Sequence, residues 1–314
     1  MGEGPGIKEK SRTAKVWLGI ACGNGLAVIL LLLSMLALKW QENFNGVYIF
    51  ADFIVVPIVI GIVNAYVLRG EKVGAPKYML YGLYNLLVVN LGAALLLREG
   101  YICLLILSPL IYFFIMMGML IGWGMFRKVD HRVNISILAG LGVLLVANLV
   151  TASPGGSTLV SDTVVIDASP DEVWKHVVAF DPITEKPEYW LFRIGLPSPV
   201  QSTAEGDFVG AWRKCIFSNG IVFDERIAEL EPGVKLTFDI TKQPDDPEIM
   251  GHLDLQKGQF ILKDNGDGTT TLIGNSWYDL KVKPPLYFNV WAKSIVRNVH
   301  LEVMQHIKTL SEAA

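Results

Sequence analysis

The sequence predicts two domains of different classes: a multi-pass bundle of five transmembrane helices, then an α+β domain whose curved antiparallel sheet wraps around a long C-terminal helix. Residues 16–151 are almost entirely apolar and are broken only by short charged loops, whereas residues 160–314 alternate as water-soluble domains do. Residues 1–159 carry 12 Lys and Arg against 7 Asp and Glu, and the remainder carries 15 against 23. We therefore expect a transmembrane domain at 1–151, a linker at 152–159 and a second domain at 160–314.

The N-terminal half contains apolar runs close to the roughly 20 residues that a membrane-spanning helix needs. There are five of them, at 16–38, 47–68, 78–97, 101–126 and 133–150, and the last is the shortest. Gly118 and Gly122 are spaced as small residues are where two transmembrane helices pack closely. Asparagines inside the runs indicate hydrogen bonds between helices rather than a transport path; they are Asn24, Asn64, Asn85 and Asn90.

The Lys and Arg residues between these runs predict the orientation of the bundle. Ten of them lie on the side of the N-terminal tail and two lie in the opposite loops. Basic loops stay on the cytoplasmic side, so we expect a cytoplasmic N-terminus in a bacterial-type plasma (inner) membrane. Five crossings would then place the C-terminal domain outside the cytoplasm. If the run at 133–150 does not cross, that domain is cytoplasmic instead.

The C-terminal half opens with a linker and a strand. The stretch TASPGGST at 151–158 is rich in Ser, Gly and Pro, and an alternating strand follows it up to about residue 167. Ser169 and Pro170 are typical of a helix N-terminus, with Glu172 at the third helical position. We expect this helix to continue through Val178 and to end at 181–182, before a short helical piece at 187–192.

Turn residues divide the next hundred residues into about six strands. Asn219-Gly220 is the strongest hairpin signal, and the run from Asn265 to Gly268 predicts a second hairpin. The expected strands cover 200–203, 208–217, 221–230, 235–241, 259–263 and 269–282.

A long amphipathic helix follows Pro284-Pro285 and runs from about 286 to 310. Its expected apolar stripe is Phe288, Trp291, Ile295, Val299, Val303, Ile307 and Leu310. A sheet curved around one helix leaves a cavity, and such cavities commonly hold apolar ligands.

Several motifs of the C-terminal half resemble the helix-grip superfamily, which includes START domains, birch-pollen allergens and polyketide cyclases/dehydrases, and is also called SRPBCC. The motifs are TVVIDASPDEVWK at 163–175, EGDFVG at 205–210, RIAELEPG at 226–233 and the closing helix at 285–308. The resemblance covers about 160–311 and implies a hydrophobic pocket. It leaves the chemistry open, because the superfamily contains binders, transfer proteins and enzymes. The membrane half resembles no family that we can name.

Two polar residues are candidates for chemistry in this pocket. Glu225 shares a strand face with Phe223 and Ile227, and a carboxyl group in an apolar pocket has a raised pKa that suits an acid or base. Alternatively, Glu225 lies at the cavity mouth or pairs with a base such as Lys214. His300 lies beside apolar residues of the closing helix, where it would anchor a polar ligand head, shuttle a proton or simply flank the core. The expected ligand-binding residues are Trp212, Phe223, Glu225, Phe238, Tyr278, Trp291 and His300.

Other classes of site lack the residue patterns that they require. Cys22, Cys103 and Cys215 form no disulfide framework or metal-spaced pair, and we expect neither a metal nor a cofactor. The sequence shows no Ser/His/Asp order and no phosphate-binding glycine loop. The acidic C-terminal half argues against nucleic acid as a partner.

We therefore expect membrane-anchored binding or handling of a lipid or other hydrophobic small molecule, without chemistry. One alternative is an enzyme of the cyclase or dehydratase kind with Glu225 and His300 as acid and base. Another is a sensor in which ligand binding alters the helix bundle. The bilayer and the hydrophobic ligand are the expected partners, and the oligomeric state is left open.

Overall fold

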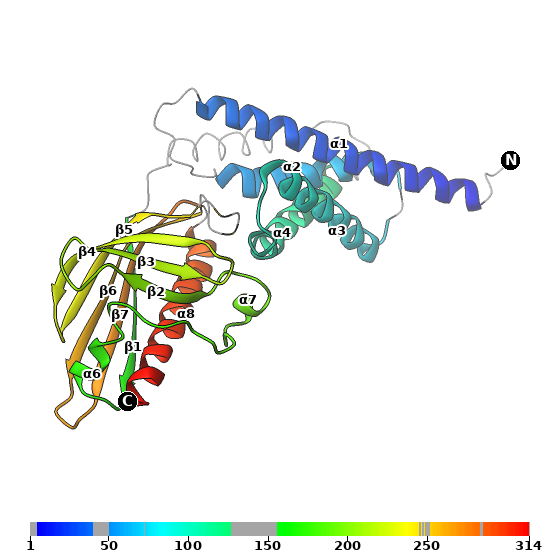
Figure 1. Cartoon of the computed structure of the whole chain (residues 1–314). Helices are drawn as coiled ribbons and strands as arrows, with labels where there is room; N and C mark the ends of the chain where they lie inside the picture. Colours follow the sequence, from blue (N-terminus) through cyan, green and yellow to red (C-terminus); the bar gives the residue numbers. More distant parts are fainter. Residues whose placement is uncertain are drawn as a thin grey trace. The chain divides into compact units, whose positions relative to one another are not determined.

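The computed structural model describes residues 5–39, 50–71, 73–126, 156–244, 246, 248, 252–282 and 285–313. The chain divides into two compact units, Met1–Ser153 and Pro154–Ala314 (Figure 1). The division falls inside the linker that the sequence predicts.

The first unit is helical, with apolar helices that match most of the predicted runs. Its elements are α1 (Pro5–Lys39), α2 (Phe50–Val67), α3 (Ala75–Gly92), the π-helical turn η1 (Ala93–Leu97) and α4 (Tyr101–Phe126). Among the described residues, three stretches are long and apolar enough to span a membrane: Arg12–Leu33, Pro76–Leu95 and Tyr101–Phe126. The apolar stretch of α2, Ile54–Val67, is shorter than a full span. The expected run at 133–150 lies outside the described residues, so the structure supplies three candidates where the sequence predicts five.

Glycines bring α2 and α4 into close contact, as the spacing of Gly118 and Gly122 predicts. A Cβ atom at Gly118 would lie 2.1 Å from the carbonyl oxygen of Ile58, and one at Gly122 would lie 2.6 Å from the Cβ of Ala65. Real side chains do not approach this closely, so only glycine permits the backbones to pack at this distance.

Three asparagines hydrogen-bond α1, α2 and α3 to one another. The Nδ2 groups of Asn24 and Asn64 both donate to Oδ1 of Asn85, at 3.0 and 3.1 Å. Asn64 and Asn85 are fully buried. Buried amides in an apolar bundle are stabilised by such mutual bonds, so the predicted role of these asparagines in joining helices is confirmed.

The second unit is a seven-stranded antiparallel sheet that curves around one long helix (Figure 1). The strands are β1 (Thr158–Ile166), β2 (Pro199–Ala204), β3 (Trp212–Phe217), β4 (Val222–Glu231), β5 (Lys235–Lys242), β6 (Leu253–Asp264) and β7 (Thr270–Leu280), in the spatial order β1-β7-β6-β5-β4-β3-β2. The helices are α6 (Pro170–Trp174), α7 (Trp190–Arg193) and α8 (Pro285–Glu312). This is the predicted α+β architecture.

Two elements are shorter than the sequence predicts. Helix α6 ends at Trp174, because the next amides bond three residues back: His176 to Val173 and Val177 to Trp174. Strand β3 begins at Trp212 rather than 208, because residues before it form a turn in which Gly210 has a φ of +92°. Only glycine adopts that backbone conformation without strain.

The core lies between α8 and the side of the sheet that packs against it, which we call the inner face. Val164, Leu272, Phe260 and Leu236 pack from the sheet against Met304 and other residues of α8. The buried positions of α8 are Phe288, Ala292, Val296, His300, Val303, Met304, His306, Ile307 and Ser311. The helix is therefore rotated from the predicted stripe: Trp291, Ile295, Val299 and Leu310 are only half-buried.

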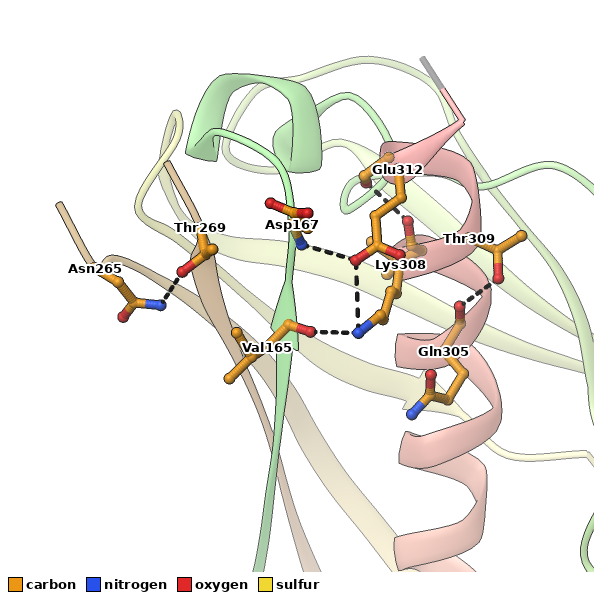
Figure 2. A network of polar contacts seen from close by, with 10 residues as sticks. Val165, Asp167, Asn265, Thr269, Gln305, Lys308, Thr309 and Glu312 are labelled. Carbon is orange, nitrogen blue, oxygen red and sulfur yellow. Dashed lines mark hydrogen bonds and ion pairs between the residues drawn. The ribbon is translucent and has the colours of Figure 1, made fainter. Parts of the chain in front are cut away.

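Polar contacts hold the C-terminal end of α8 to the end of β1 (Figure 2). Lys308 Nζ donates to the carbonyl oxygen of Val165 at 2.8 Å, and the amide of Asp167 donates to Glu312 Oε1 at 2.7 Å. Lys308 and Glu312 also lie 3.5 Å apart. These bonds lie at the surface and join the last turns of α8 to the end of β1.

Candidate functional site

The inner face brings together five of the seven predicted ligand-binding residues. Four of them, Phe223, Glu225, Phe238 and Tyr278, are buried on strands, and His300 reaches the same face from α8. Side chains alternate between the two sides of a strand, so Phe223, Glu225 and Ile227 share one side, as the sequence predicts. The two tryptophans lie elsewhere. Trp212 is on the opposite side of β3, 44% exposed, and Trp291 is a half-buried residue of α8.

Glu225 forms a buried ion pair with Arg213, directly opposite it on β3. Arg213 is 2% exposed and Glu225 is 4% exposed, and the guanidinium donates to Glu225 Oε2. Arg213 Nε also donates to the carbonyl oxygen of Val178 at 2.9 Å, and its guanidinium lies 4.5 Å from the ring centroid of Phe238. Burial raises the pKa of Glu225, and the charge of Arg213 opposes that rise. An acid or base role would require this pair to open.

One interpretation of the sequence pairs Glu225 with a base such as Lys214. The actual partner is Arg213, the residue before Lys214. Arg213 faces Glu225 in the strand register, whereas Lys214 faces Asp224 on the other side of the sheet. The one-residue difference follows from the register of β3 against β4, because a shift of one residue exchanges the two faces of a strand.

His300 is the centre of a hydrogen-bonded chain that the sequence analysis missed. Its Nε2 lies 2.7 Å from Ser276 Oγ on β7, and its Nδ1 lies 3.0 Å from Asp162 Oδ2 on β1. Arg297 Nε approaches the other carboxylate oxygen of Asp162 at 3.3 Å. His300 is 6% exposed, and burial lowers its pKa, with the bond to Asp162 opposing that shift.

No sequence motif marks this hydrogen-bonded network, since Ser276 and Asp162 lie 24 and 138 residues from His300. The register of the sheet brings them together: Asp162 is opposite Gly274, one inward position before Ser276. A Cβ at Gly274 would lie 2.7 Å from Met304 Sδ and 3.7 Å from His300 Cγ. The absence of a side chain at Gly274 thus lets α8 lie close enough for His300 to reach both strands.

Tyr278 adds a neutral polar group near the other end of the inner face. It is fully buried, and its hydroxyl donates to Asn289 Oδ1 on α8 at 2.5 Å. Burial raises the pKa of Tyr278 to about 12, so the phenol stays protonated at neutral pH.

The second unit matches a known family. Residues 157–312 match the family described as polyketide cyclase / dehydrase and lipid transport. No curated protein matches the chain.

Several solved structures are similar to about half of the chain. Norcoclaurine synthase from Thalictrum flavum is 12% identical with a TM-score of 0.34, over 49% of this chain and 86% of that chain. Ara h 8.0201 is 13% identical with a TM-score of 0.36, over 51% of this chain and 100% of that chain. A protein from Mesorhizobium loti is 15% identical with a TM-score of 0.33, over 50% of this chain and 98% of that chain. At these values the likeness is no basis for assigning a ligand or a reaction.

Proposed function

We propose, from a C-terminal domain that resembles the helix-grip superfamily, that this chain binds a lipid or another apolar small molecule and that its N-terminal helices hold the domain at a bacterial-type plasma (inner) membrane. The match of residues 157–312 to a family of cyclases, dehydrases and lipid-transport proteins is the observation that carries the proposal.

The inner face suits an apolar ligand. Aromatic rings such as Phe223, Phe238 and Phe260 lie on it together with aliphatic side chains from five strands and α8. The buried charges on this face are compensated, since Glu225 pairs with Arg213 and Asp162 contacts His300 and Arg297. Sites for small apolar molecules have this composition, with few polar groups that fix the orientation of the ligand.

The membrane part of the proposal is supported by the N-terminal helices. Three candidate spans lie among the described residues, and the excess of Lys and Arg on one side favours a cytoplasmic N-terminus. If α2 and residues 133–150 also cross the membrane, the five crossings place the binding domain outside the cytoplasm.

Ligand binding is tested on the full chain purified in detergent. Native mass spectrometry should detect a co-purified apolar ligand, and a fluorescent fatty acid should bind and quench tryptophan emission. Phe223→Leu should weaken this binding while keeping most of the packing, because it replaces an aromatic ring of the inner face by an aliphatic side chain. Trp212→Phe is the matched control, since Trp212 is exposed on the opposite side of the sheet. Absence of both ligand and probe binding would exclude the proposed function.

A further inference from the structure

We infer that Ser276, His300 and Asp162 form a hydrolytic centre in which Ser276 is the nucleophile toward an apolar carboxylic ester. The inference rests on the proposed function for the class of substrate, because it places the reaction on the face where the apolar ligand would bind. It goes beyond that function by adding a covalent reaction.

The three side chains meet the geometric requirements for an activated serine. A serine is activated when a histidine nitrogen lies within hydrogen-bond reach of its hydroxyl and a carboxylate holds the other ring nitrogen. Here Ser276 Oγ is 2.7 Å from His300 Nε2, and Asp162 Oδ2 is 3.0 Å from Nδ1. Such triads are recognised by geometry rather than by order in the sequence, and here the order is Asp, Ser, His.

The electrostatic surroundings keep His300 ready to accept a proton. Burial lowers its pKa, so the imidazole is neutral at pH 7. A neutral ring that donates Nδ1–H to Asp162 leaves Nε2 to accept the bond from the Ser276 hydroxyl. The charged groups that contact this site are Asp162 from β1 and Arg297 from α8, and Arg297 holds Asp162 from its other oxygen.

The strands beside Ser276 offer apolar surface to an acyl chain. Ser276 lies between Val160 on β1 and Gly258 on β6 in the sheet register. The ring of Phe238 occupies the space that a side chain at Gly258 would need, because a Cβ there would lie 2.4 Å from it. Ser276 is half-buried, whereas Leu272 and Tyr278 on the same side of β7 are fully buried. The hydroxyl therefore lies on the less completely packed part of an apolar wall.

The reaction is an ordinary two-step ester hydrolysis. Ser276 Oγ adds to the ester carbonyl carbon while His300 Nε2 takes the hydroxyl proton, and this proton then passes to the leaving alkoxide as the C–O bond breaks. Water next adds to the acyl-serine, giving one proton to His300, which returns it to Ser276 Oγ as the acyl bond breaks. The products are a carboxylic acid and an alcohol, and no oxidant or cofactor takes part.

The test is covalent labelling of the full-length chain in detergent. Two phosphonylating probes are used, a long-chain alkyl fluorophosphonate and the small diisopropyl fluorophosphate, with peptide mapping of the adduct. We expect one adduct, on Ser276. We also expect p-nitrophenyl dodecanoate to be hydrolysed faster with the protein than in detergent solution without it. Ser276→Ala should remove both signals. Asp162→Asn should slow labelling by about 10²- to 10⁴-fold, because the histidine loses the partner that orients it.

Ser294→Ala is the matched control. Ser294 lies on α8, as His300 does, but its hydroxyl bonds to Tyr189 rather than to His300. Its labelling should equal that of the unaltered chain. If neither probe modifies Ser276 in the unaltered chain, the three residues form only a structural network and the inference is wrong. Continued binding of the fluorescent fatty acid in that experiment would leave the proposed function standing, whereas labelling without fatty-acid binding would count against the binding function alone.

Discussion

Arg213 and Glu225 carry opposite charges inside an otherwise apolar part of the sheet. Both side chains are almost fully removed from water. Each charge is tolerated because the other neutralises it. The carbonyl oxygen of Val178 and the ring of Phe238 also contact the guanidinium. The pair is therefore sensitive to the loss of one member.

We predict that Glu225→Gln or Arg213→Met alone lowers the free energy of unfolding by about 3–5 kcal/mol, because each leaves an uncompensated buried group. The double variant Arg213→Met with Glu225→Leu should recover most of this loss, since apolar replacements of both partners leave no buried charge. Urea unfolding of a fragment covering 156–314 measures the effect, with Lys214→Met as the control on the other side of β3. A double variant no more stable than the single ones would contradict this account.

His300 makes stability depend on pH in a defined direction. Its folded-state pKa lies below the ordinary value of 6.5, so between these two values the unfolded chain binds more protons than the folded one. The contribution of His300 to stability is therefore complete above about pH 6.5 and falls as the pH drops toward its folded-state pKa, by up to about 1.4 kcal/mol per pH unit.

Melting curves of the 156–314 fragment between pH 5 and pH 8 test this dependence. The raised pKa of Glu225 acts in the opposite sense above pH 4.5, so the comparison is made against His300→Gln, which keeps Glu225. The difference in melting temperature between the two proteins should shrink as the pH falls below 6.5. A difference independent of pH would mean that burial does not shift the titration of His300.

Helix packing in the N-terminal unit depends on the closeness of α2 and α4. A side chain at Gly118 would collide with the backbone of Ile58, whereas a Cβ at Gly124 on the same helix would meet nothing within 4 Å. We predict that Gly118→Ala lowers the melting temperature of the full chain in detergent, at a cost of roughly 1–3 kcal/mol. Gly124→Ala should leave the melting temperature unchanged. Equal effects of the two substitutions would mean that the observed contact does not stabilise the bundle.

Elements of the second unit follow from local chemistry where a turn decides them. Asn219-Gly220 joins β3 to β4 as predicted, with Gly220 at a φ of +81°. The rotation of α8 was not predictable in this way. Its apolar spacing fits two adjacent stripes, and the position of Gly274 on β7 selects the one that places His300 and Met304 against the sheet.

For the whole molecule, the number of membrane crossings decides on which side the C-terminal domain lies. The distribution of basic residues predicts a cytoplasmic N-terminus. With five crossings, a C-terminal alkaline phosphatase fusion should be active in a bacterial host and a C-terminal GFP fusion should be dark. The reverse result would remove the span at 133–150 or overturn the orientation.

The second unit has the features of a domain that folds on its own. The residues from Pro154 onward form a compact unit with their own core between sheet and helix. We expect the 156–314 fragment to be soluble and to melt cooperatively, because its size and core are those of an autonomous domain. Circular dichroism during heating measures this, and aggregation under all conditions would show that the core requires the N-terminal helices.

The sequence by itself determined the division into an apolar and a soluble half, the α+β class of the second unit, its hairpins and its resemblance to the helix-grip superfamily. These properties depend on composition, on alternation and on turn residues such as Asn219 and Gly220, all of which act over a few neighbouring positions. The number of spans stays a prediction, since 133–150 lies outside the described residues.

Only the tertiary structure decided which polar residues meet. Arg213 rather than Lys214 neutralises Glu225, because the register of β3 against β4 puts Arg213 opposite Glu225. Asp162 and Ser276 meet His300 across separations of 138 and 24 residues, because strand register and the close approach of α8 place them together. Those contacts depend on packing between distant segments, which no local pattern in the chain encodes.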